Sequence, residues 1–68
     1  MPDAVGIDGA WPVGSVLLRY PATLRVFKRF GLDVYRGWPL SLAEAAELDG
    51  VELPALIRSL VVEREVSQ

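Results

Sequence analysis

The sequence predicts an all-α protein, a compact bundle of about four short helices. Apolar residues recur at the helical period in four separate segments. Proline or glycine lies between successive segments, where either residue can end one helix or open the next. No segment alternates apolar and polar residues in the manner of a half-buried strand, so helices are the only regular structure expected.

The chain divides into an irregular arm at residues 1–11 and a small helical domain at residues 12–68. The arm carries Pro2, Gly6 and Gly9 and has no sustained apolar period. A chain of 68 residues is one domain, and a domain this short buries only about 60% of the surface that its unfolded chain exposes. We therefore expect some further interaction to supplement its small core.

The first two helices meet at Pro21. The first has an apolar face at i, i+3, i+4 and i+7, formed by Val13, Val16, Leu17 and Tyr20. Pro21 must end that helix, and it suits the first turn of the next. The second helix has a broad apolar arc, formed by Leu24, Val26, Phe27 and Phe30. Gly31 can close it in the left-handed conformation, with Leu32 folding back as the accompanying apolar contact.

A loop is expected at residues 33–40, because Gly37 and Pro39 both oppose regular structure. Ser41 and Glu44 then form a capping box that opens the third helix. The buried stripe of this helix consists of Leu42, Ala45 and Ala46. Its small residues would let a neighbouring helix approach closely, and Gly50 ends the helix.

The last helix begins near Glu52, with Pro54 tolerated in its first turn. It has the most regular apolar face in the chain, formed by Leu53, Leu56, Ile57, Leu60 and Val61.

The residue counts argue against catalysis. The chain has no Cys and no His, so the usual ligands of zinc and iron–sulfur sites and the usual base of a serine or cysteine nucleophile are missing. We expect no enzyme activity, no metal and no cofactor. The apolar runs are far shorter than the roughly 20 residues of a membrane helix. Without a basic N-terminal region, a secretory signal is not expected either, so no membrane is expected as a partner and the cytoplasm is the default location.

A spaced pattern extends over most of the chain: Tyr20, Pro21, Thr23, Val26, Phe27, Gly31, Leu32, Asp33, Gly37, Ser41, Leu42, Glu44, Ala45, Gly50, Leu56 and Leu60. This pattern resembles the N-terminal domain of the ScdA/YtfE-type iron-centre repair proteins and the related hybrid-cluster-protein-associated redox disulfide domains. The resemblance implies the small helical fold. Tyr35 and Arg36 stand where that family has a cysteine pair, and Trp38 replaces its second glycine. The thiols of the family's proposed redox or metal role are therefore absent.

The segment that replaces the cysteines is the first candidate site. Tyr35, Arg36 and Trp38 are of the side-chain types most enriched at binding hot spots, which makes them candidates for partner binding. The alternative is that Tyr35 and Trp38 are core plugs that cover helix ends with their large apolar area. Asp33 is expected to bond nearby backbone amides in a turn and not to act as a catalytic acid.

A basic strip on the second helix is the other candidate. Arg25, Lys28 and Arg29 lie opposite its apolar arc and could hold phosphates. The acidic residues gather after Ser41, so the strip could equally complement them within the molecule or across an oligomer. The net charge of −2 and the lack of a known binding motif favour this second interpretation over nucleic acid.

Four apolar residues fall outside the main stripes: Leu18, Leu40, Leu48 and Val62. If they gather on the surface, self-association would bury them and supplement the core. We therefore expect a protein-interaction module without catalytic activity, with itself as partner in a homodimer or with another protein. The alternatives are a cysteine-less accessory protein in redox or iron-centre repair and a weak nucleic-acid binder.

Overall fold

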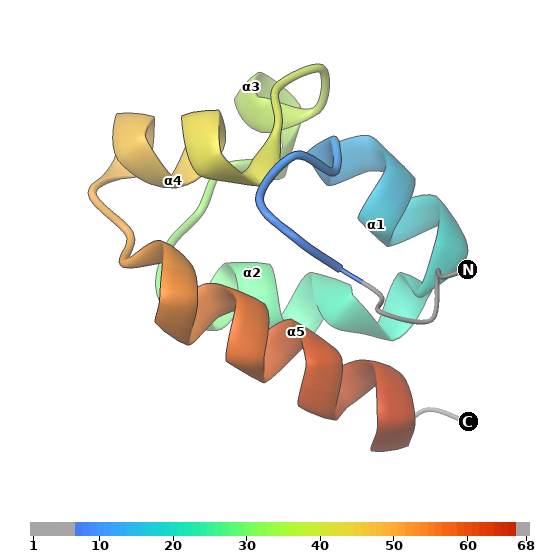
Figure 1. The fold of residues 1–68 in the computed structure, drawn as a ribbon. Coiled ribbons are helices and arrows are strands. Elements are labelled where there is room, and N and C mark those ends of the chain that lie inside the picture. The colour runs from blue at the N-terminus through green and yellow to red at the C-terminus, as the bar shows by residue number, and fades with distance from the viewer. Residues whose placement is uncertain (1–6, 67–68) are drawn as a thin grey trace.

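The computed structural model describes residues 7–66. Its elements are α1 (Val13–Arg19), the 3-10 turn η2 (Pro21–Thr23), α2 (Leu24–Phe30), α3 (Val34–Gly37), α4 (Leu42–Asp49) and α5 (Leu53–Val66). Over this range there is no strand, and an isolated bridge joins Pro12 to Ser41. The all-α prediction is confirmed. Figure 1 shows α5 and α2 along one side of the molecule, with α3 and α4 along the other and α1 closing one end.

Two backbone segments cap the helices that start beside them. The first amides of α1, at Val13 and Gly14, donate to the carbonyls of Leu40 and Trp38 at 2.9 and 3.2 Å. In the same way, the amides of Leu42 and Ala43 at the start of α4 donate to carbonyls of the arm, at Trp11 and Gly9. These bonds satisfy amides that a helix leaves without internal partners. They also fix the arm against α4, as Figure 1 shows for its blue segment.

The core forms where α1, α2, α4 and α5 meet. Its largest fully buried side chains are apolar: Phe27, Leu42, Leu56, Leu60, Val13, Val16 and Val26. Phe27 is 0% exposed, which confirms its predicted place in the core. The described part of the arm contributes Ile7, which is also buried. Among the described residues, every buried side-chain polar atom has a hydrogen-bond partner; the Thr23 hydroxyl donates to the Tyr20 carbonyl at 2.6 Å.

The turn after α2 has the predicted form. Gly31 lies in the left-handed region at φ 77°, which a residue with a side chain rarely adopts. The Leu32 amide donates to the Phe27 carbonyl at 2.9 Å, and the Leu32 side chain is buried. This arrangement is the glycine-closed helix end expected from the sequence.

The loop predicted at residues 33–40 contains a one-turn helix, α3, so that prediction is wrong in part. The Asp33 carboxylate accepts hydrogen bonds from the amides of Tyr35 and Arg36 at 3.0 and 3.2 Å. This cap starts the helix despite the glycine that ends it. The structural role expected for Asp33 is confirmed.

The third predicted helix agrees with α4. The Ser41 hydroxyl accepts from the Glu44 amide, and the Glu44 carboxylate accepts from the Ser41 amide, each at 3.1 Å. The stripe of Leu42, Ala45 and Ala46 is buried. A side chain at Gly37 would place its Cβ 3.3 Å from the Ala45 Cβ. The small residues therefore bring α3 close to α4.

The longest helix, α5, packs its predicted face against the core. Leu56 and Leu60 are fully buried, while Leu53 and Ile57 are partly buried. Near the end of the helix, the Arg64 guanidinium lies 6.0 Å from the centre of the Tyr20 ring. This contact joins α5 to the turn between α1 and α2.

Candidate interaction surface

The three candidate binding residues of α3 and the turn after it have different surroundings. Tyr35 is 90% exposed, so the core-plug interpretation is wrong for it. Trp38 is 44% exposed, and its indole lies against Gly14 of α1, where an added Cβ would come within 2.6 Å of the ring. The plug interpretation therefore holds for Trp38 only in part. Arg36 makes an ion pair with Asp49 of α4.

Asp49 fixes α3 to the end of α4. One carboxylate oxygen binds the Arg36 guanidinium, and the other accepts a hydrogen bond from the Asp33 amide at 2.9 Å. The Asp49 side chain is 9% exposed and the Arg36 side chain is 56% exposed, so solvent reaches and screens this pair from the Arg36 side. The position of Tyr35 on the surface thus depends on a contact between residues 13 to 16 positions apart.

An apolar groove lies beside Tyr35. It has a volume of about 300 Å³, and α1, η2, α2 and α3 supply its lining: Leu17, Pro21, Leu24, Val34, Tyr35 and Trp38. Leu24 is 38% exposed although the helical period places it on the apolar arc of α2. The groove therefore combines large apolar side chains that an isolated domain leaves in contact with water.

A second hollow continues from this groove across Pro21 and Leu24, which line both. Its volume is about 260 Å³, and Arg25 and Lys28 form its basic border. Apolar groove and basic border lie next to each other because Leu24 and Lys28 are four residues apart on one helix. The surface is therefore suited to binding an apolar side chain that has an acidic neighbour.

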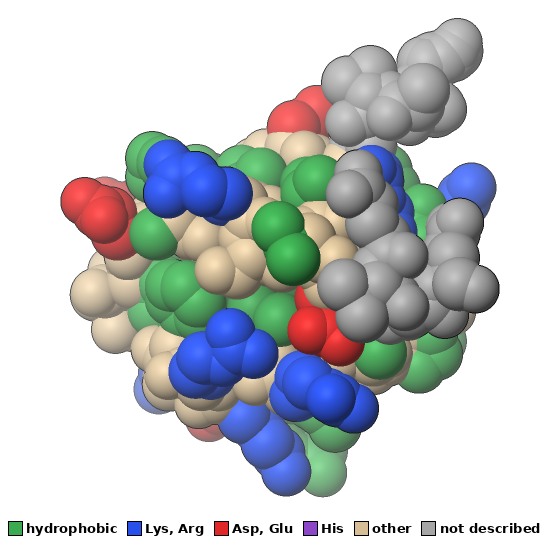
Figure 2. Space-filling view, turned by 90° about the horizontal axis from the view of Figure 1, so that it is seen from below, with side chains coloured by type: hydrophobic (Ala, Val, Ile, Leu, Met, Phe, Trp, Pro, Cys, Tyr) green, Lys and Arg blue, Asp and Glu red, His purple; other side chains and the backbone are tan. Residues whose placement is uncertain are grey.

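The basic strip is exposed and partly neutralised. Arg25 makes an ion pair with Glu63 of α5 at 3.8 Å, the kind of internal complement that the sequence allowed. Lys28 and Arg29 make no ion pair with any of residues 7–66. Figure 2 shows several basic side chains close together along the lower part of the face seen from below, with apolar side chains beside them.

The four off-stripe apolar residues do not share one surface role. Leu18, Leu48 and Val62 are 76%, 57% and 55% exposed. Leu40 is partly buried and packs against the core, so the surface patch does not include it. The exposed three lie on three different helices, α1, α4 and α5.

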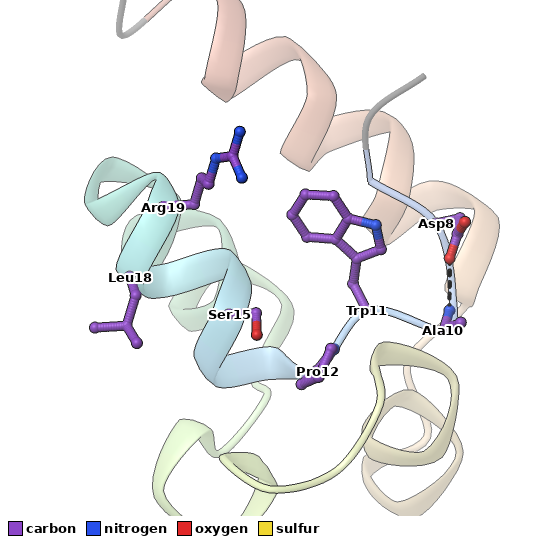
Figure 3. Close-up of a pocket in the computed structure, with 7 residues that line it drawn as sticks. All are labelled: Asp8, Ala10, Trp11, Pro12, Ser15, Leu18 and Arg19. Atoms are coloured by element: carbon purple, nitrogen blue, oxygen red, sulfur yellow. Dashed lines mark hydrogen bonds between the residues drawn. The ribbon is translucent and has the colours of Figure 1, made fainter. Parts of the chain in front are cut away.

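A larger hollow of about 610 Å³ lies between the arm and α1, lined by Asp8, Ala10, Trp11, Pro12, Ser15, Leu18 and Arg19. Figure 3 shows the Trp11 indole between Asp8 on one side and Arg19 on the other. The Asp8 carboxylate accepts the Ala10 amide at 2.8 Å and so shapes the local turn. Because the indole separates the two charged groups, the hollow presents no coupled acid and base.

Residues 7–66 contain no group of three or more His, Cys, Asp or Glu side chains that could hold a metal ion. Within the same range, every helix is too short or too polar to cross a membrane.

Comparison with known proteins gave no match, whether to protein-family models, to curated proteins or to solved structures. The resemblance to the iron-centre repair domains therefore stays a prediction.

Sequence reasoning found Tyr35 and Trp38 but missed the groove between them and α2. Leu17 and Leu24 belong to regular apolar faces, and such faces are expected in the core. The groove depends on how four elements converge, which their separate periods do not specify. One feature of the sequence did indicate exposed apolar surface: the chain has more apolar residues than a small core can bury.

Proposed function

We propose that this protein is a small helical protein-interaction module, without catalytic activity of its own, that forms a homodimer. The observation that carries the proposal is the gathering of exposed Tyr35, Trp38 and Leu24 around one apolar groove. Aromatic side chains next to an apolar hollow are typical of the energetic centre of an interface. Burying them would also supplement a core limited by chain length.

Internal contacts support this assignment, because they hold the groove in shape before any partner binds. Trp38 lies on Gly14, and Asp49 fixes the turn that carries Tyr35. A surface ordered in advance loses less conformational entropy on binding than a loose one does. The backbone that carries Tyr35 is therefore held in one place.

The mass in solution tests the proposal. Light scattering at micromolar concentration is expected to give twice the chain mass for the parent protein. Tyr35→Ala should shift the protein toward the monomer while its helical circular dichroism stays unchanged, since a hot-spot side chain contributes about 2 kcal/mol or more to binding. Val62→Ser removes another exposed apolar side chain, from α5 and outside the groove, and serves as the control.

A parent protein that remains monomeric up to millimolar concentration would contradict self-association. Equal weakening of the dimer by Tyr35→Ala and Val62→Ser would show that the groove is not the centre of the interface.

A further inference from the structure

The outer face of α4 is complementary to the groove and its basic border, because it carries an exposed apolar side chain next to an acidic one. Its buried stripe faces the core, so Ala43, Glu44, Glu47 and Leu48 are left exposed. Leu48 is 57% exposed and Glu47 makes no ion pair with a described residue, whereas the Glu44 carboxylate is used in the capping box. This face therefore offers a large apolar side chain with a free carboxylate directly beside it.

Charge is divided between two segments of the chain. Residues 12–32 contain four cations and no acid, namely Arg19, Arg25, Lys28 and Arg29. Residues 41–52 contain four acids and no cation, namely Glu44, Glu47, Asp49 and Glu52. The two ion pairs, Arg25 with Glu63 and Arg36 with Asp49, do not join these segments to each other. Lys28 and Glu47 each retain an unneutralised charge within the described structure.

The groove and α4 lie on either side of α3. Val34 and Tyr35 line the groove, and Arg36 on the same helical turn binds Asp49 at the end of α4. Figure 1 shows α3 next to α4 on one side of the molecule. Since α3 contacts both, a two-fold rotation with its axis near α3 would bring each surface to its complement on the other copy, and such a contact closes at two copies.

We propose that the groove receives α4 of a second copy of this chain, with Leu48 in the apolar groove and Glu47 beside Lys28. This inference rests on the homodimer proposed above and names the surfaces that form it. Leu48 then meets Leu24, Tyr35 and Trp38, and the two-fold axis passes near α3. Each dimer contains two Leu48 contacts and two pairs of Lys28 with Glu47.

Reversing the charge at Lys28 in one copy and at Glu47 in the other tests this arrangement with the protein alone. Lys28→Glu alone and Glu47→Lys alone each place like charges opposite each other twice in a dimer. Each variant is expected to dimerise on the order of tenfold more weakly than the parent at low salt. An equimolar mixture of the two variants pairs opposite charges at both positions, so it should form a heterodimer of near-parental affinity.

A control variant, a second test variant and a folding measurement accompany the exchange. Arg58→Glu reverses a cation on α5 that makes no ion pair within residues 7–66, and it should leave dimerisation unchanged. Leu48→Ala should weaken the dimer at any salt concentration, because its loss is apolar. Unchanged circular dichroism in every variant confirms that folding is intact.

The outcomes separate this inference from the proposed function. If the parent dimerises but the charge variants and their mixture behave like it, the pairing with α4 is wrong and the homodimer stands. A mass that grows beyond two copies with concentration would overturn the two-fold arrangement, since it indicates an open chain. A monomeric parent would overturn both proposals.

Discussion

At the scale of single residues, Trp38 serves both the fold and the surface. Its carbonyl accepts the Gly14 amide that opens α1, and its indole lies on the same glycine. The ring nevertheless stays 44% exposed and lines the groove. The sequence indicated that Trp38 would matter, but its contact with Gly14 joins residues 24 positions apart, which no local pattern can specify.

Phe27 shows the opposite case, a residue whose place follows from helical period alone. It lies at the centre of the apolar arc of α2 and is 0% exposed. Phe27→Ala should lower the free energy of unfolding by about 3 to 5 kcal/mol, because it removes a ring and leaves a cavity. Urea denaturation measures this loss. Arg29→Ala on the same helix is the control and should change it by less than about 0.5 kcal/mol. A midpoint equal to the parent's for Phe27→Ala would contradict its central role.

At the scale of elements, the features that could be predicted are those formed by residues close together in the sequence. The capping box of α4, the glycine that ends α2 and the proline between α1 and α2 act within a few positions, and all are found as expected. In contrast, the first amides of α1 and α4 bond to carbonyls of distant segments. Only the packed structure brings those donors and acceptors together, so no local pattern of residues indicates them.

The one-turn helix α3 depends on both kinds of contact, and Asp49 supplies the distant one. Asp49→Ala removes the acceptor of the Asp33 amide and the partner of Arg36. We expect a loss of about 0.5 to 1.5 kcal/mol in the free energy of unfolding, as for a hydrogen bond and an ion pair whose partners water can reach. Faster hydrogen exchange should appear at the Asp33 amide and in α3. Glu52→Ala, an exposed acid without an ion pair in the described structure, should change neither quantity. Unaltered exchange in Asp49→Ala would mean that Asp33 alone holds the turn.

At the scale of the whole molecule, the basic and acidic residues lie in different segments, and each segment also exposes apolar surface. The acid-free segment at residues 12–32 supplies the basic border and part of the groove, and the cation-free segment at residues 41–52 supplies the outer face of α4. The sequence showed this uneven charge distribution, but it could not show that α3 lies between the groove and α4. The groove itself arises only from the convergence of four elements.

The same distribution of charge argues against nucleic acid as the partner of the basic strip. Arg25 is already paired with Glu63, which leaves Lys28 and Arg29 as the free cations of α2 in a molecule whose net charge is −2. Few phosphate contacts mean little counterion release, and hence weak binding that salt abolishes. We expect the mobility of duplex DNA and of single-stranded RNA to be unchanged by the protein at physiological salt. A retarded band that weakens steeply as salt increases would show instead that the strip binds phosphates. If Lys28→Glu then abolished that band, α2 would be identified as the binding element, and its role in the dimer would need a separate measurement.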